Sequence, residues 1–174
     1  YIDHETTSDL ITTAAIWHQS GKLKVRGSIV SKENKGIVLS NNGGDTVLLL
    51  DSCQVSAKNF AFSTLNGTSN IYAEIVNSEV TKTSDNVFSA ITLGTTLGQV
   101  EVSVNHSTVT NRSTTANSYG IEILDNNSTL RLNNVKVDVN SVSGPSIYSP
   151  TPRTILIESV VVTNKALDVN VTNG

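Results

Sequence analysis

The chain has little of several residue types, and each scarcity excludes a class of protein. Its 174 residues include one cysteine, which excludes an internal disulfide framework and a cysteine-rich zinc site. Only 16% of the residues are charged, and the net charge of −3 argues against nucleic acid as a partner. No apolar run approaches the roughly 20 residues that span a bilayer, so we expect no membrane insertion by this segment. Methionine is absent and no signal segment opens the chain, so we expect a fragment or a processed product.

The abundant residues are Asn, Ser, Thr and Val, which favour strands and tight turns over helices. They are arranged in a repeat. Six segments with alternating apolar residues recur every 25 to 29 residues: KLKVRGSIV, VLLLDSCQV, YAEIVNSEV, EVSVNHSTV, TLRLNNVKV and TILIESVVV. Aligned on their last valine, all six carry apolar residues five and seven positions earlier. The aligned valines are Val30, Val55, Val80, Val109, Val137 and Val162.

Each repeat predicts two short strands joined by a corner, followed by a third strand. The apolar residues alternate at period 2 on both sides of a two-residue offset, which is typical of strands that meet at a bend. Corner pairs such as Asn133-Asn134 contain residues that tolerate a bent backbone. A third alternating stretch follows, with expected inward pairs Ile37/Leu39, Phe60/Phe62, Ile91/Leu93, Ile121/Ile123, Ile147/Ser149 and Leu167/Val169.

This ordered triplet predicts an all-β fold, a right-handed single-stranded parallel β-solenoid with three strands per coil and about six to seven coils. An antiparallel sandwich is the alternative, since a sequence does not show strand direction, but a sandwich gives no reason to repeat the same triplet. We expect residues 1–13 to be an N-terminal lead-in. We expect residues 14–174 to form the β-helix, as a fragment of a longer solenoid whose neighbouring coils would cover its open edges.

A recurrent corner shortly after the aligned valines carries basic residues. Stacked coils would place these residues about 5 Å apart, within the roughly 8 Å over which charges act at physiological salt. We call them the basic ridge: Lys32, Lys58, Lys82, Arg112 and Lys165. Such a ridge fits an acidic polysaccharide or a sulfated glycan, and the alternative is that exposed corner lysines serve solubility and discourage strand pairing.

Other candidate contacts are sparse. Trp17, Tyr119 and Tyr148 offer faces on which a sugar ring can stack, but they lie in different coils, so no aromatic platform is expected. Glu122 and Asp168 are expected outward but two coils apart, at about 10 Å, which exceeds the separation typical of either glycosidase class. The remaining carboxylates of neighbouring coils fall in different columns: Glu74, Glu79 and Glu101. We therefore expect no catalytic residue, no metal site and no cofactor.

The segment STVTNRSTTANSYGIEILDNNSTLRLNNVKV at 107–137 joins a hydroxyl-rich turn, a YGI-like strand, an Asn-rich loop and a new apolar alternation. It resembles the passenger domains of Gram-negative autotransporters of the pertactin and antigen-43 type, within the pectin-lyase-like β-helices. The resemblance covers roughly residues 14–174, and phage tailspikes and polysaccharide lyases share its motifs. It implies an exported rod on the bacterial cell surface that mediates adhesion, self-association or biofilm growth. The chain is poorer in glycine than many passengers.

These observations favour a non-enzymatic extracellular adhesin or surface-binding segment that contacts a surface glycan or another copy of itself. The second hypothesis is a phage tailspike or fibre segment on the virion tail, a homotrimer that recognises host polysaccharide. Outward apolar residues such as Leu49, Leu156 and Val161 would then serve the trimer interface. The third hypothesis is a polysaccharide lyase or hydrolase.

Overall fold

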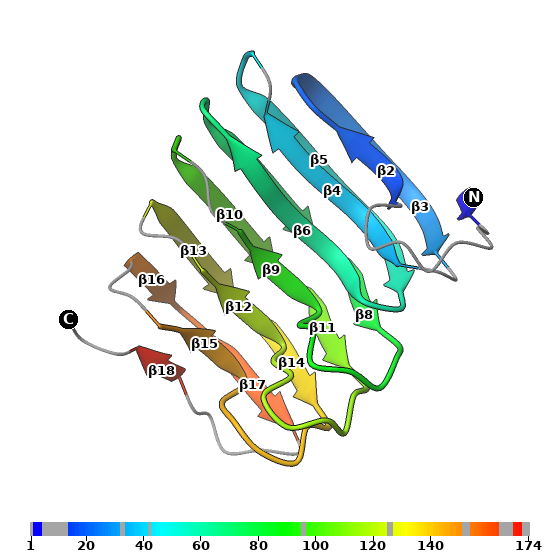
Figure 1. Ribbon diagram of the computed structural model, residues 1–174, viewed down its shortest axis with the longest axis vertical. Helices are drawn as coiled ribbons and strands as arrows, with labels where there is room; N and C mark the ends of the chain where they lie inside the picture. The colour runs from blue at the N-terminus through cyan, green and yellow to red at the C-terminus, as the bar shows by residue number, and fades with distance from the viewer. Residues whose placement is uncertain are drawn as a thin grey trace.

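The computed structural model describes residues 2–4, 14–31, 34–41, 43–94, 97–124, 127–150, 154–163 and 169–171. Within these ranges all regular secondary structure is β-strand, and every strand pairing is parallel. The strands stack as a parallel β-solenoid of about five turns (Figure 1), which excludes the sandwich. This count is slightly lower than the predicted six to seven coils. The right-handed sense stays a prediction.

The first two strands of each coil belong to one sheet that bends at the corner, here called the two-armed sheet. Its strands are β1 (Ile2–His4), β3 (Gly21–Ser31), β5 (Thr46–Ala57), β7 (Ile71–Val76), β8 (Glu79–Lys82), β10 (Val100–Asn105), β11 (Thr108–Asn111), β13 (Ser128–Asn133), β14 (Val135–Val139), β16 (Thr154–Ile157) and β17 (Val160–Thr163). Because β3 and β5 run through the corner without a break, they join the β7–β10–β13–β16 arm to the β8–β11–β14–β17 arm.

The third strand of each coil belongs to a separate sheet, here called the third-strand sheet. Its strands are β2 (Ala14–His18), β4 (Lys35–Asn41), β6 (Phe60–Gly67), β9 (Ile91–Leu93), β12 (Ile121–Ile123), β15 (Ile147–Ser149) and β18 (Val169–Val171). They stack in chain order, so each coil pairs with the coil before it and the coil after it (Figure 1). The core lies between the two sheets and consists mainly of Val, Ile and Leu.

The predicted apolar columns are confirmed residue by residue. One column of register partners runs through Val25, Leu50, Ile75, Val104, Leu132 and Ile157, and a second through Leu23, Leu48, Ala73, Val102, Leu130 and Ile155. Five of the six aligned valines, from Val55 to Val162, are also register partners. Fully burying such a side chain stabilises by about 1.5–3 kcal/mol, and here stacking of coils provides that burial.

The predicted corners are visible in the backbone. The second residue of five corner pairs has a positive φ: Gly27 at 103°, Ser52 at 56°, Asn77 at 50°, His106 at 49° and Asn134 at 52°. Asn is among the non-glycine residues that tolerate this left-handed conformation best. The bend is therefore encoded locally in the repeat.

The first repeat departs from the predicted alignment. The register shifts between Val25 and Gly27, so Ile29 pairs with Val55 and Val30 pairs with Ser56. The inward residue at this position is therefore Ile29, and the alignment on Val30 is wrong by one residue. At this corner Arg26 alone lies opposite Asp51 and Ser52 of the next repeat, and this β-bulge changes the alternation of everything that follows it.

A bulge also opens the third strand, and it corrects one predicted inward pair. The amides of Ala61 and Phe62 both donate to the carbonyl of Ala90, at 3.1 Å each, and both side chains belong to the core. The inward pair of this coil is therefore Phe62 with Thr64, which pair with Ile91 and Leu93, while Phe60 lies outside. In the last coil Val169 and Val171 pair with Ile147 and Ser149, and Leu167, the other predicted inward residue, lies outside the described residues.

Candidate functional site

The structure does not form the predicted basic ridge as a continuous exposed line. Lys58 and Arg112 are exposed, but Lys82 is 0% exposed, and Lys32 and Lys165 lie outside the described residues. Lys82 pairs with Ala57 and Asn111, which are also fully buried. The expected exposure of Lys82 is wrong because it lies two residues after an aligned valine, in the inward phase, whereas Lys58 and Arg112 lie three after. Ligand binding by Lys58 and Arg112 stays a prediction.

Lys82 instead holds the loop that follows β8. Its Nζ donates to the carbonyls of Ser84 at 2.7 Å and Asn86 at 3.2 Å, and lies 3.5 Å from Oδ1 of Asn111. Burial lowers the pKa of Lys82 to about 8, and the charge of Asp85 opposes this shift. A buried ammonium surrounded by oxygen acceptors has a structural role, because none of its donors is left for a ligand.

Asp85 fastens this loop to the loop of the next coil. Its carboxylate accepts from the amides of Thr114 at 2.8 Å and Thr115 at 3.0 Å, and from the hydroxyls of both residues. The Ser113 hydroxyl donates to it at 3.1 Å. Hydrogen bonds from Thr114 and Thr115 lower the pKa of Asp85 to about 2.

We expect the hydrogen bonds to Asp85 to make the free energy of unfolding depend on pH in the acid range. The pKa of Asp85 is about 2 in the fold against 3.8 ordinarily, so its contribution is complete above about pH 4 and disappears as the pH falls through 2. Urea denaturation from about pH 5 to pH 2 should show a smaller acid loss for Asp85→Asn than for the wild type. Glu158→Gln removes an exposed carboxylate on the same rod and should show the same acid loss as the wild type. Equal acid losses in Asp85→Asn and the wild type would contradict this role.

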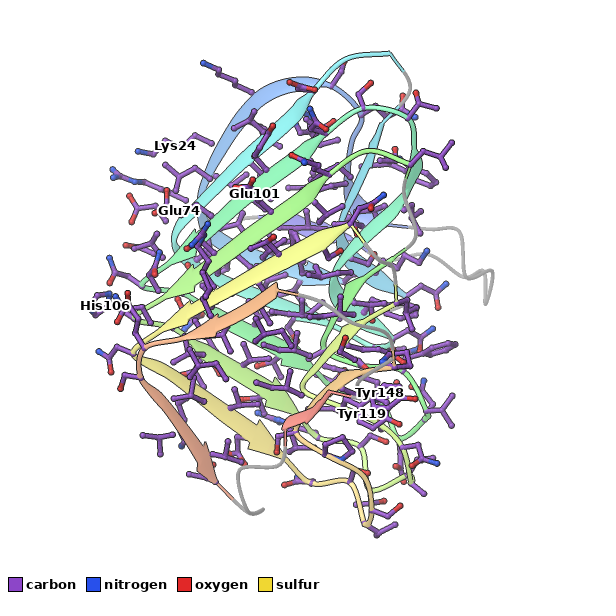
Figure 2. All side chains as sticks on the ribbon, turned by 90° about the vertical axis from the view of Figure 1, so that its left-hand side faces the viewer. Lys24, Glu74, Glu101, His106, Tyr119 and Tyr148 are labelled. Atoms are coloured by element: carbon purple, nitrogen blue, oxygen red, sulfur yellow. The ribbon has the colours of Figure 1, made fainter. Side chains whose placement is uncertain are left out.

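Two of the predicted aromatic residues lie together, which the sequence did not predict. The rings of Tyr119 and Tyr148 stack with centroids 4.5 Å apart, and Tyr119 is only 8% exposed beneath its partner. Burial raises the pKa of Tyr119. Trp17 is 46% exposed, and its Nε1 donates to Ser40 Oγ at 2.6 Å. The tyrosine pair lies on the opposite side of the rod from Glu74 and Glu101 (Figure 2).

The carboxylate pair considered from the sequence is described only in part. Glu122 lies on the outer side of β12, half-buried, and Ser89 Oγ donates to it at 3.1 Å. Burial raises the pKa of Glu122, and Asp168 lies outside the described residues. In the part of the chain that the structure describes, no three His, Cys, Asp or Glu side chains group as a metal site, and no helix is long and apolar enough to cross a bilayer.

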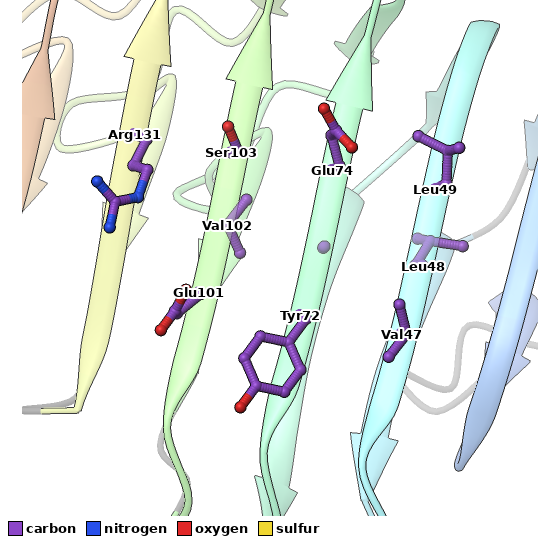
Figure 3. A pocket seen from close by; sticks show the side chains of 10 residues that line it. Val47, Leu48, Leu49, Tyr72, Glu74, Glu101, Val102, Ser103 and Arg131 are labelled. Atoms are coloured by element: carbon purple, nitrogen blue, oxygen red, sulfur yellow. The ribbon is translucent and has the colours of Figure 1, made fainter.

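The best-formed site is an open groove on the outer face of the two-armed sheet, over β5, β7, β10 and β13 (Figure 3). We call it the β7–β10 groove, and its volume is about 410 Å³. Two rows of register partners line it. The first row is Val47, Tyr72 and Glu101, and the second is Leu49, Glu74, Ser103 and Arg131. Adjacent strands lie about 4.8 Å apart, so each row runs along the rod and each residue is one rung from the next.

The groove presents polar side chains that have no partner in the part of the chain that the structure describes. The side chains of Tyr72, Glu101 and Arg131 make no hydrogen bond or ion pair with the described residues. Glu74 has one long contact, at 3.5 Å from Nδ2 of Asn105. Glu74, Glu101 and Arg131 are exposed, while Tyr72 is half-buried. The groove therefore offers an aromatic face and a carboxylate in its first row, and a second carboxylate and a planar donor in its second row.

The charges on this face are segregated. Outward Lys22, Lys24 and Arg26 occupy β3, before the groove, while Glu74 and Glu101 lie within it. Asp51 lies between them, 2.9 Å from Nε of Arg26 and 3.9 Å from Nζ of Lys24. The hydrogen bond from Arg26 lowers the pKa of Asp51. The face thus has a basic end and an acidic middle.

The sequence did not predict this site: Glu74 and Glu101 are expected in different columns, which the register confirms, and nothing in the repeat pointed to Tyr72 and Arg131 beside them. Only a general signal was present, since outward positions between the apolar columns must stack as regularly as the inward ones. Comparisons of the chain with known protein families, with curated proteins and with solved structures found no match.

Proposed function

We propose that this chain is a non-enzymatic, extracellular binding segment that holds a neutral, hydroxyl-rich glycan along the β7–β10 groove. It would belong to a right-handed β-helix of the autotransporter passenger type, exposed on a bacterial surface. The observation that carries the proposal is that the side chains of Tyr72, Glu101 and Arg131, on three adjacent strands of the groove, have no hydrogen-bond or ion-pair partner among the described residues.

The chemistry of the groove matches a sugar chain. A ring can stack on the half-exposed Tyr72, while sugar hydroxyls donate to the carboxylates and accept from Arg131. Two carboxylates against one guanidinium favour a neutral glycan over an acidic one, because a like charge would be repelled. Because the groove follows the stacking direction, an extended polymer can make several weak contacts at once, and their sum increases binding.

Both groove carboxylates are exposed to water, which supports binding over hydrolysis. The acid of a glycosidase is typically enclosed in an apolar environment that keeps it protonated. Neither Glu74 nor Glu101 lies in such an enclosure.

Binding to an array of neutral and acidic polysaccharides tests the proposal. Tyr72→Ala is expected to weaken binding of the preferred neutral glycan about tenfold, because it removes the stacking face. Arg131→Gln should weaken it several-fold. Lys136→Met on β14, an exposed position on the other arm, is the matched control and should bind as the wild type does. The absence of glycan binding by the wild type, or unchanged binding by Tyr72→Ala, would refute the proposal.

The segregated charges favour a second candidate function, self-association side by side. Rotation of one copy by half a turn would bring Lys22 and Lys24 of each rod near Glu101 and Glu74 of the other, as an isologous contact. Sedimentation at low and high salt separates the possibilities. A dimer that dissociates as salt increases supports self-association, and a salt-resistant trimer supports the tailspike hypothesis.

A further inference from the structure

A second pocket lies on the outer face of the third-strand sheet, on β4, β6 and β9. Its volume is about 240 Å³, and its lining includes Lys35, Phe60, Ser63, Thr92 and Leu124. The bulge explains why these side chains point outward. Ala61 and Phe62 both face the core, so Phe60 and Ser63 on either side of them face out, and Ala90 and Ile91 form the same kind of pair one coil later. Lys35 stacks on Phe60, and Ser63 on Thr92, as register partners.

Two hydroxyls in this pocket are buried without a partner, and the lysine beside them has no hydrogen bond or ion pair with the described residues. Oγ of Ser63 and Oγ1 of Thr92 accept and donate no hydrogen bond, although the residues are only 3% and 7% exposed. Lys35 is 6% exposed, and its ammonium has no hydrogen bond or ion pair with the described residues, only the Phe60 ring at 5.6 Å. Burial accordingly lowers the pKa of Lys35.

Leaving such groups unpaired is costly. A buried hydroxyl or ammonium without a partner loses the hydrogen bonds that water would provide, and native proteins satisfy most of these groups. The other fully buried lysine, Lys82, has oxygen acceptors around its Nζ. Two unpaired hydroxyls that are register partners, together with a lysine that has no oxygen acceptor among the described residues, line one pocket and indicate a ligand that completes them.

The lining specifies the chemistry of that ligand. One lysine matches a single negative charge, so a carboxylate fits better than a phosphate dianion. The Phe60 ring and Leu124 match the apolar face of a ring, and the two hydroxyls match ring hydroxyls. The volume equals that of about eight water molecules, enough for one sugar ring. Glu122 is the register partner of Thr92 and lies one rung beyond it, so it repels an anion at that end and leaves the Lys35 end for the carboxylate.

We propose that this pocket binds a hexuronate residue, with its carboxylate on Lys35, its ring against Phe60 and its hydroxyls on Ser63 and Thr92. The pocket and the β7–β10 groove lie on different sheets, so the assignment does not depend on the function proposed above.

Titration of the 174-residue chain with glucuronate, followed through amide chemical shifts, tests the assignment. We expect saturable shifts confined to β4, β6, β9 and the adjoining loops, with a Kd of about 1 mM. Glucose, the neutral match, should bind at least about tenfold more weakly, because it cannot form the charge-assisted contact with Lys35. Lys35→Met should weaken glucuronate binding about tenfold and Thr92→Val several-fold. Lys136→Met is the matched control and should leave it unchanged.

Lys35→Met also separates a binding role from a structural one. It replaces an ammonium that has no protein partner among the described residues by an apolar side chain of similar length. The urea concentration at the midpoint of unfolding should therefore be equal to or higher than that of the wild type. Tyr72→Ala should leave glucuronate binding intact, which distinguishes this pocket from the groove. No saturation at about 50 mM glucuronate, shifts mapping elsewhere, or equal affinity in Lys35→Met would overturn the assignment.

Discussion

Phe62→Ala is expected to lower the free energy of unfolding by about 3–5 kcal/mol, as large-to-small substitutions in a packed core do. Phe62 is 0% exposed and lies between its register partners Ile37 and Ile91, one coil on either side. The coils are fixed at strand spacing by backbone hydrogen bonds, so they cannot move together to fill the space left by the ring. Urea denaturation, followed by the circular dichroism signal of β-strands at about 218 nm, measures the loss.

Phe60→Ala is the matched control, since it removes the same ring two residues away on the outer side. Phe60 is half-buried and packs on Phe88 with ring centroids 4.6 Å apart. Its loss should cost less than half as much as the loss of Phe62. Equal losses at the two positions would contradict the bulge at Ala61 and Phe62 and restore the simple alternation expected from the sequence.

Asn111→Ala is expected to cost about 2–4 kcal/mol, the second-largest effect, because it disrupts a fully buried polar cluster. Nδ2 of Asn111 donates to the Tyr119 carbonyl at 2.6 Å and to Ser118 Oγ at 2.9 Å. Its Oδ1 accepts from the Ser113 amide at 3.0 Å and lies 3.5 Å from Lys82 Nζ. The truncated variant would leave buried donors and an acceptor unpaired, and thermal or urea unfolding at neutral pH measures the loss.

A double-mutant cycle with Lys82→Met shows whether the two residues act together. Removing the ammonium removes the need for one acceptor, so the double variant should lose less than the sum of the two single losses. Lys82→Met alone should cost less than Asn111→Ala, because it replaces a buried charge by an apolar side chain of similar length. A loss below about 0.5 kcal/mol for Asn111→Ala would show that the cluster does not hold this corner.

The sequence predicted the parts of the fold that depend on periodic burial. Columns such as the one through Val25, Leu50 and Ile75 follow from apolar alternation at a constant spacing, and the register confirms them. The predictions that were wrong all lie after a backbone irregularity. The slip at Gly27 moved the first alignment by one residue, and the bulge at Ala61 reversed the side on which Phe60 lies. Alternation carries no signal for an extra residue until a partner strand is known.

The same limit applies to the candidate sites. Lys82 was expected outside because lysine is seldom fully buried, and only its register partners Ala57 and Asn111 show that its position faces the core. The sequence predicts Glu74 and Glu101 in different columns and gives no sign that Tyr72 and Arg131 lie beside them. The outward placement of Lys35 and Phe60 depends on the bulge, whereas alternation already places Thr92 outside without indicating a pocket there.

The direction of the hydrogen bonds has a mechanical consequence. In a parallel β-solenoid the hydrogen bonds between coils run along the stacking direction. A force applied in that direction therefore acts on the hydrogen bonds between two coils and does not stretch the covalent chain within each coil. The outermost coil then peels away first, followed by the next. Each of the 25 to 29 residues in a coil contributes about 3.3–3.6 Å when extended, so every event lengthens the tether by roughly 80–100 Å. The rod would thus extend in discrete increments under tension while its remaining coils stay folded.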